Sequence, residues 1–327
     1  MGKGAAAERA AHRLRNMTRR HGDTETRRKC FRQKSVFFLP KLLGVLCVFL
    51  AVDVFPQTEL EFLAEKITRG STEQKRDALF QIRNLQTAAA SLLAVPALQD
   101  RSEIVRATAA FSVIFLPPDE AARNLVPLLA DKKPLVRREA AYALGKVRSP
   151  QTINPLVRVW RKDKIPEVRN AAILALGEIG DAAAISELVV ILQRKPQSKE
   201  EFLRRSAARS IGQIAQIIQT NRTKVLTPEN FLPAEFKKIE KPNFPKLIDD
   251  FPAFRPAVGI LIEVLQNRRD FPDVKREAAF ALGAIGDEAA VPVLQANLNS
   301  EDYYLAEICR ESVRRIAVYA EYAKIKE

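Results

Sequence analysis

The chain is poor in histidine. Among its 327 residues the only two histidines are His12 and His21, both near the N-terminus. Histidine is the commonest protein ligand of transition metals and the usual base of nucleophilic triads. Sites of these kinds are therefore excluded beyond residue 21. We expect no metal, no cofactor and no set of catalytic residues, and hence a chain that is not an enzyme.

Cysteine and glycine are scarce as well. The three cysteines are Cys30, Cys47 and Cys309, so no internal disulfide can hold the part of the chain beyond residue 58 together. The 12 glycines form no loop of the kind that cradles phosphate. Alternating β-branched runs, which are typical of strands, are few. The apolar content of 47% supports a well-buried core, and we expect an all-α fold.

One stretch of the chain recurs. Residues 163–181, DKIPEVRNAAILALGEIGD, return as 270–287, DFPDVKREAAFALGAIGD, and as 131–147, DKKPLVRREAAYALGKV. We define the register position as the residue just before the repeated basic residue. It falls at Gln74, Val105, Val136, Val168, Leu203, Val274 and Leu305, with gaps of 31, 31, 32, 35, 71 and 31. A period of this length predicts stacked helical hairpins.

The copies share further offsets from the register position. Most have small residues four and seven positions after it and apolar residues eight and eleven positions after it. These offsets lie on one face of an α-helix. Glycines recur at the ninth position, where they would let neighbouring helices approach closely. They are Gly145, Gly177, Gly212 and Gly283.

The shared pattern V-R-x-x-A-A-x-A-L-G-x-I-G-D resembles HEAT repeats of the bilin-lyase-like (phycobilisome lyase) subclass. The resemblance covers residues 58–327. It implies an all-α fold, a right-handed α-α superhelix, here with an N-terminal hydrophobic segment. Some HEAT-type proteins are di-iron hydroxylases built on His-Glu pairs, and no such pair is present here.

The resemblance also implies an ion-pair ladder between adjacent repeats. Its members are acid–base pairs six residues apart. An anion-binding stripe is the alternative interpretation of the same basic residues. The pairs are Asp100 and Arg106, Asp131 and Arg137, and Asp163 and Arg169.

Positive charge is concentrated at the N-terminus. The chain carries a net charge of +14, and residues 1–41 hold 12 Lys/Arg against 3 Asp/Glu, or +9, which leaves +5 for the other 286 residues. The repeats are therefore nearly balanced. This argues against nucleic acid as a partner, because phosphate binding needs a basic surface.

The N-terminal region divides into two parts. Residues 1–35 form a basic tail that we expect to be disordered, with Met17 as an alternative start. Residues 36–55 are strongly apolar around the uncharged core 42–52. We interpret them as a signal peptide or a membrane anchor, with a buried core helix as a third alternative. The first two place the repeats outside the cytoplasm, in the periplasm or cell envelope. The membrane would be contacted only through this segment.

The gap of 71 contains an insertion at residues 217–255. It holds five prolines and five phenylalanines, among them Phe231, Phe236 and Phe244. Prolines prevent one long helix, and a disordered linker would rarely carry so many aromatic rings. The rings either pack on the flank of the repeats or form a docking segment for a partner.

We predict a non-enzymatic scaffold that binds a protein partner on its concave surface. By analogy with related solenoids, Arg158, Arg161, Gln266 and Gln295 would line that surface. Two alternatives remain open. One is a bilin-lyase-like enzyme or chaperone, which the repeat subclass implies. The other is a nucleic-acid-binding HEAT-like protein.

Overall fold

The computed structural model describes residues 54–222, 239 and 241–326. Contacts divide the chain into two units, Met1–Val54 and Phe55–Glu327, and the fold described below is that of the second. The predicted basic tail and nearly all of the predicted signal or anchor segment lie outside the described residues. Within the described part of the chain, no helix combines the length and the apolarity needed to cross a bilayer.

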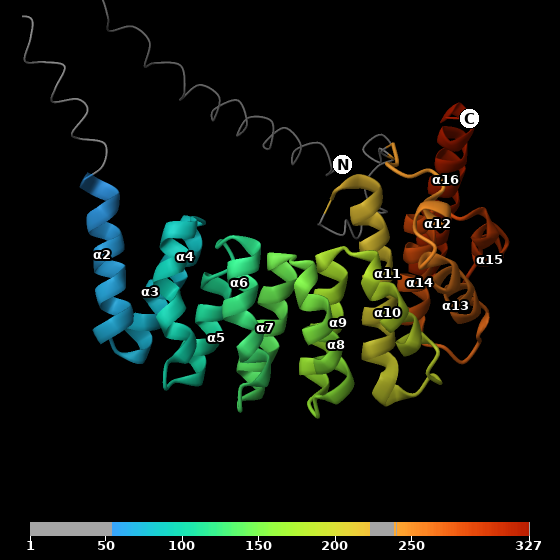
Figure 1. The fold of residues 1–327 in the computed structure, drawn as a ribbon. Helices are drawn as coiled ribbons and strands as arrows, with labels where there is room; N and C mark the ends of the chain where they lie inside the picture. The colour runs from blue at the N-terminus through green and yellow to red at the C-terminus, as the bar shows by residue number, and fades with distance from the viewer. Residues whose placement is uncertain (1–53, 223–238, 240, 327) are drawn as a thin grey trace, which may run out of the picture. The chain divides into compact units, whose positions relative to one another are not determined.

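The register positions lie on one row of helices, which we call the first row (Figure 1). Each first-row helix packs against the next one along the chain. After the opening helix α2 (Val54–Arg69), the row consists of α3 (Thr72–Leu85), α5 (Glu103–Ser112), α7 (Pro134–Val147), α9 (Pro166–Ile179), α11 (Glu201–Thr220), α14 (Pro272–Ile285) and α16 (Tyr303–Lys326).

The second helix of each hairpin is shorter and joins a 3₁₀ turn in most repeats. We call these helices the second row. They are α4 (Ala88–Ala94) with η1 (Val95–Gln99), α6 (Pro118–Leu125) with η2 (Val126–Ala130), η3 (Pro150–Thr152) with α8 (Ile153–Lys162), η4 (Ala182–Ala184) with α10 (Ile185–Leu192), α13 (Phe254–Gln266), and η8 (Glu288–Ala290) with α15 (Val291–Ala296). The described residues contain no strand. The structure thus confirms the all-α HEAT-like solenoid.

Local sequence sets the turns between rows. Gly180 and Gly286 end α9 and α14 with φ of +78° and +83°, a left-handed conformation that favours glycine. An aspartate follows each glycine, and its carboxylate accepts a hydrogen bond from a backbone N–H two residues further on. Ala183 donates to Asp181 at 2.8 Å, and Ala289 donates to Asp287 at 2.9 Å. The chain therefore reverses within two residues and starts the second helix at once.

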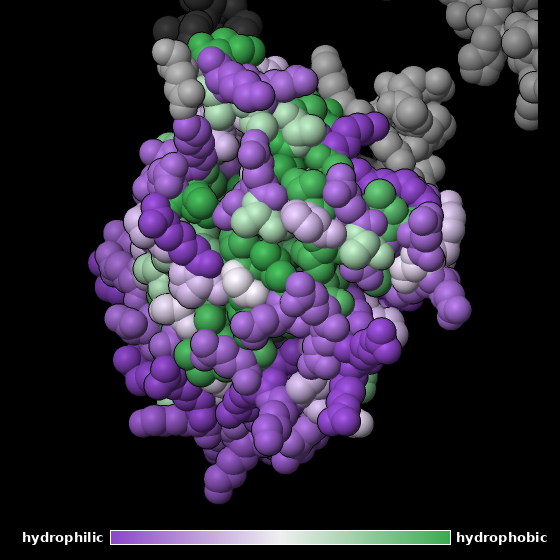
Figure 2. All heavy atoms as spheres, turned by 90° about the vertical axis from the view of Figure 1, so that its right-hand side faces the viewer, coloured by the Kyte–Doolittle hydropathy of each residue, from purple (hydrophilic) through white to green (hydrophobic). Residues whose placement is uncertain are grey.

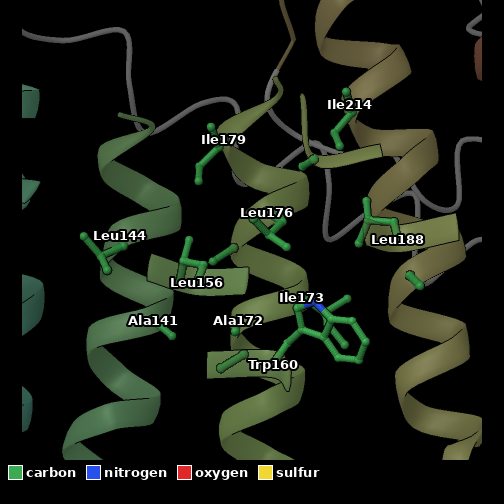
Figure 3. Close-up of a cluster of buried hydrophobic side chains, with 14 of the residues drawn as sticks. Ala141, Leu144, Leu156, Trp160, Ala172, Ile173, Leu176, Ile179, Leu188 and Ile214 are labelled. Atoms are coloured by element: carbon green, nitrogen blue, oxygen red, sulfur yellow. The ribbon is translucent and has the colours of Figure 1, made fainter. Parts of the chain in front are cut away.

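The core is a continuous seam between the rows. Leu144 and Leu176 come from successive first-row helices and lie at one level, Ile179 and Ile214 lie above them, and Leu156 and Trp160 approach from the second row (Figure 3). Trp160 is 3% exposed, which makes it a core residue. Each repeat therefore completes its core only with the help of its neighbours.

Small residues bring the first-row helices together. A Cβ added to Gly177 would lie 2.8 Å from the Cα of Ser210 on the next helix. The serines at offset seven also form hydrogen bonds across the seam. Ser112 donates to the carbonyl of Leu79 at 2.8 Å, and Ser210 donates to that of Ile173 at 3.0 Å. Ser312 and Ala279 repeat this contact at 2.9 Å.

The described end of the insertion returns to the solenoid. The backbone N–H of Asn243 donates to the carbonyl of Gln219 at 2.8 Å, and α12 (Leu247–Asp250) follows. Phe254, the first residue of α13, is fully buried. At this end of the unit, around α13 and α16, apolar surface gathers within a polar rim (Figure 2).

Replacing a packing glycine is expected to destabilise the stack. Gly177→Ala should lower the free energy of unfolding by about 1–3 kcal/mol, because its Cβ would lie 2.6, 2.7 and 2.8 Å from the Oγ, Cβ and Cα of Ser210, of which only Oγ can rotate away. Gly259→Ala is the matched control, since nothing lies within 4 Å of its added Cβ. It should be neutral or stabilising by up to about 1 kcal/mol, as expected for a helix interior. Urea unfolding followed by circular dichroism measures both variants. Equal stability of the two would contradict the close-contact interpretation.

Candidate functional site

The first-row helices leave one stripe of side chains exposed. The stripe contains the residues one position before the register position and three and six positions after it, which share a helix face. From α3 to α11 the positions one before and six after the register position are largely apolar, and we call these apolar side chains the apolar band. The positions three after it hold Asp77, Thr108, Glu139, Ala171 and Ser206. The members of the apolar band are Phe80, Ile104, Phe111, Leu135, Tyr142, Leu174 and Phe202, of which Phe80, Ile104 and Phe202 are 52%, 42% and 59% exposed.

Three rings of the band occupy the same position in consecutive repeats. Phe80 on α3, Phe111 on α5 and Tyr142 on α7 each lie six residues after the register position. Phe111 and Tyr142 are half-buried. Burial raises the pKa of the Tyr142 hydroxyl, so this group stays neutral and can donate a hydrogen bond.

The band opens into a hollow of about 420 Å³ between α7, α9 and the start of α11. Tyr142, Pro166 and Phe202 supply apolar wall, and Glu167 and Lys199 are charged residues that also line it. Both are exposed, and neither has a hydrogen bond or ion pair within the described part of the chain. The hollow therefore offers apolar walls and one free charge of each sign.

An insertion in the repeat period borders this hollow. Residues 194–200 lengthen the gap between register positions to 35 and contain η5 (Ser198–Glu200). They bring Lys199 to the hollow, and Phe202 follows at the start of α11. An ion pair of 2.8 Å between Arg194 and Glu200 closes the inserted turn.

Ion pairs join successive repeats beside the seam. The guanidinium of Arg106 donates two hydrogen bonds to Asp131, at 2.8 and 3.0 Å, and Arg137 does the same to Asp163 at 2.6 and 3.0 Å. Lys75 lies 2.6 Å from Asp100. Each of these aspartates thus pairs with the basic residue of the preceding repeat. Arg106 contacts its own repeat through the backbone carbonyl of Asp100, at 2.8 Å.

Arg169 does not follow this arrangement. Its Nε donates to the carbonyl of Trp160 at 3.0 Å, and the structure pairs it with no carboxylate. The inserted residues 194–200 occupy the place where the other repeats supply an aspartate. The structure therefore joins Arg106 and Arg137 to acids in the next repeat and leaves Arg169 outside the series.

Hydrogen bonding keeps the carboxylates of the series ionised. Burial alone would raise the pKa of Asp131. The hydrogen bonds from Arg106 and from the backbone of Lys133 outweigh it, and the pKa is lowered below its ordinary value. The same opposition lowers the pKa of Asp100 and Asp163.

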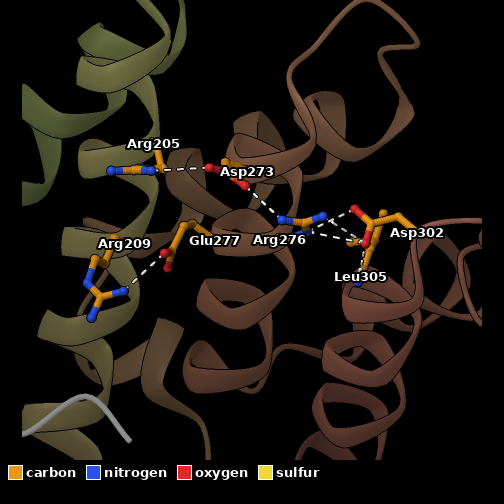
Figure 4. A network of polar contacts seen from close by, with 7 residues as sticks. All are labelled: Arg205, Arg209, Asp273, Arg276, Glu277, Asp302 and Leu305. Carbon is orange, nitrogen blue, oxygen red and sulfur yellow. Dashed lines mark hydrogen bonds and ion pairs between the residues drawn. The ribbon is translucent and has the colours of Figure 1, made fainter. Parts of the chain in front are cut away.

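Charges at the C-terminal end of the first row are largely paired. Arg205, Asp273, Arg276 and Asp302 form a chain of contacts across α11, α14 and α16 (Figure 4), with 3.1 Å between Arg205 and Asp273 and 2.9 Å between Arg276 and Asp302. Arg209 contacts Glu277 at 3.0 Å. Burial raises the pKa of Glu277 even beside Arg209. This end of the surface therefore presents balanced charge.

The residues predicted to bind a partner lie elsewhere. Arg158 and Arg161 are on α8, Gln266 is on α13 and Gln295 is on α15, all in the second row. Arg161 pairs with Glu187 at 2.8 Å. The structure does not bring these residues to the apolar band, and their role in binding stays a prediction.

The phenylalanines of the insertion divide into two groups. Phe231 and Phe236 lie outside the described residues. Phe244 is half-buried and packs edge-to-face on Phe251, with 5.2 Å between ring centroids. Its partner-binding role also stays a prediction. Phe111 and Tyr142 were not among the predicted site residues, although their shared offset from the register position is a signal visible in the sequence.

Two protein families match the chain. The family described as "HEAT repeats" matches residues 91–176, and the "PBS lyase HEAT-like repeat" matches residues 168–194 and 274–300. The chain contains HEAT repeats within residues 91–194 and 274–300. Its repeats include those of the bilin-lyase-like type that the sequence pattern predicted.

Relatives of this HEAT-repeat protein match it over short stretches. Deoxyhypusine hydroxylase of Homo sapiens is 40% identical over 60 residues, or 18% of this chain and 20% of the relative. The Gallus gallus protein of that name is 37% identical over 70 residues, or 21% and 23%. The chain thus spans about a fifth of the length of the curated relatives.

Solved structures resemble the HEAT-repeat protein in fold. Human deoxyhypusine hydroxylase in complex with glycerol has a TM-score of 0.36 at 19% identity, covering 80% of this chain and 97% of that one. The complex of CpcE and CpcF of phycocyanin lyase from Nostoc sp. PCC7120 has a TM-score of 0.42 at 18% identity, covering 90% and 99%.

The comparisons contradict one prediction. We predicted a non-enzymatic chain from its lack of histidine, and the curated relatives of this HEAT-repeat protein are enzymes by name. The prediction was wrong because it considered only histidine-dependent metal sites, nucleophilic triads and phosphate-binding glycine loops. Within the described residues, no group of three or more His, Cys, Asp or Glu side chains is placed to hold a metal ion.

The most deeply buried ion pair makes a testable contribution to stability. Arg204 and Asp270 are 2% and 0% exposed, and Arg204 also donates to the carbonyls of Leu192 and Arg194. Arg204→Met should lower the free energy of unfolding by about 3–5 kcal/mol, because Asp270 is left charged and buried.

Two further variants test this reason. Lys146→Met removes a pair with Glu178 whose lysine is 53% exposed and should cost less than about 1 kcal/mol. The double variant Arg204→Met/Asp270→Leu should recover much of the loss, because no unpaired charge remains. Urea midpoints measure all three. A single Arg204→Met variant no less stable than Lys146→Met would refute the expectation.

Proposed function

We propose that this HEAT-repeat protein binds a protein partner along the exposed surface of the first row. The observation that carries the proposal is the apolar band. Soluble proteins rarely expose a contiguous apolar patch without an interaction that uses it. Here half-exposed apolar residues follow one another at matching positions on four neighbouring helices, α3, α5, α7 and α9, and Phe202 adds to them from α11.

The position of the band supports a binding role. First-row helices pack on one another more extensively than second-row helices do. In a stack of hairpins, the more closely packed row lies on the inner side of the curve, and solenoids use such surfaces for extended partners. The band would therefore lie where a partner can contact several repeats at once.

Charge favours protein over nucleic acid as the partner. A phosphate-binding surface needs unpaired Lys and Arg in number. Three first-row arginines, Arg205, Arg209 and Arg276, each contact a carboxylate. Apolar contact supplemented by a few polar groups is typical of protein interfaces.

Two variants compare the two candidate surfaces. Phe111→Ser with Leu174→Ser alters the apolar band, and Arg158→Ala with Gln266→Ala alters the second row. Partners are crosslinked in native cells and identified by mass spectrometry. We expect the band variant to lose at least one partner that the second-row variant retains. Loss in the second-row variant alone would move the site to that surface. Identical partners for both variants and the unaltered chain would refute both placements.

We also propose that residues 36–55 direct export of the repeats or tether them to a membrane. The support is the basic flank followed by the uncharged core 42–52. Protease added to intact cells or spheroplasts should then degrade the repeats, while a cytoplasmic marker survives. Full protection of the repeats, with degradation after lysis, would refute export.

A further inference from the structure

We propose that the apolar band binds a proline-rich segment in the polyproline II conformation, with prolines at every third residue seated on Phe80, Phe111 and Tyr142. This inference rests on the proposed function and specifies the chemistry of its partner. It starts from the three aromatic rings that occupy one position in consecutive repeats.

The spacing of the rings selects the conformation of the bound segment. Packed helices lie about 8–10 Å apart, so rings at one helical position repeat at about that distance. Three residues of polyproline II advance about 9.3 Å and complete one turn, which returns the same face to the surface. A β-strand brings residues to one face at about 6.8 Å, and two turns of α-helix advance about 10.8 Å. The three-residue period fits the rings best.

The groups beside the rings suit such a segment. Polyproline II makes no internal hydrogen bonds, so its carbonyls need outside donors. The guanidinium of Arg83 lies 4.1 Å from the centre of the Phe80 ring. The Tyr142 hydroxyl, which is neutral, is a further donor beside the hollow; Arg138 also lines it, but its guanidinium already donates to Glu139 at 2.8 and 2.6 Å. Aromatic walls with nearby donors are the usual means of recognising this conformation.

The series of rings sets the length of the segment. The same offset holds Leu174 on α9 and Arg209 on α11, so the rings end at Tyr142. Three rings accommodate three prolines in a stretch of seven residues. The hollow lies directly after Tyr142 and provides space for the side chain that follows the last proline.

Two synthetic peptides of identical composition test the spacing. One carries prolines at positions 1, 4 and 7 of a nine-residue stretch, and the other carries them at 1, 5 and 9. Binding of each labelled peptide to the full chain is measured by fluorescence anisotropy. We expect the first to bind at least fivefold more tightly than the second. Equal affinity, or no binding of either peptide, would refute the inference.

Matched variants test the location. Phe111→Ala and Tyr142→Ala should each weaken binding of the first peptide at least fivefold, with folding checked by circular dichroism. Phe62→Ala is the control, because Phe62 on α2 is 55% exposed and has Lys66 4.4 Å from its ring centre, much as Arg83 lies over Phe80. It should change affinity less than twofold. An equal loss in the control would mean non-specific adhesion and refute the site. If band variants lose a native partner but neither peptide binds, the proposed function stands and this inference fails.

Discussion

The solenoid depends on the close approach of neighbouring first-row helices through small side chains. Alanine and glycine at offsets four, seven and nine remove the bulk that would hold the helices apart, and serine adds to this. Ser112, Ser210 and Ser312 fit the small-residue position and also donate a hydrogen bond to the preceding helix. The contact therefore combines dense packing with hydrogen bonds that fix the register between neighbouring helices. Packing alone would leave these helices free to slide along one another.

Much of the fold could be predicted from the sequence because the repeat supplies the same information several times. The offsets of Val136, Ala140 and Leu144 define one buried face, and the same offsets in other copies agree. All three side chains are fully buried. The pattern of a single amphipathic helix shows which face is buried but not which element covers it. A period of 31 residues also predicts that each helix packs on the helix at the same position in the next repeat.

The site was harder to predict, because the period constrains only what is buried. The residues six positions after the register position are Phe80, Phe111, Tyr142, Leu174, Arg209, Phe280 and Glu311. The first three share an aromatic ring, but the later copies do not, and the offset alone does not show that these rings are exposed. The predicted residues Arg158 and Gln266 lie on the second row, away from the band, and their role in binding stays a prediction. Only the coordinates show which row packs more closely and which side chains remain accessible there.

The similarity to deoxyhypusine hydroxylase is confined to a short stretch of the chain. An aligned stretch of 60 residues is about the length of two repeats of 31. Residues that repeat within the chain are those that pack against neighbours, and two solenoids can share them while their exposed faces differ. A match of this length can therefore arise from the repeat pattern alone, and it does not identify what the exposed band binds.

One short insertion lies beside two departures from the regular stack. Residues 194–200 stand where an aspartate would meet Arg169, and their Lys199 lines the hollow between α7, α9 and the start of α11. The series of Arg–Asp ion pairs is therefore interrupted at Arg169, next to the hollow. Across the next junction, the fully buried pair of Arg204 and Asp270 joins α11 to α14 despite the longer insertion in the chain. The first-row helices thus stay packed on one another on both sides of α11, and the core remains continuous across both insertions.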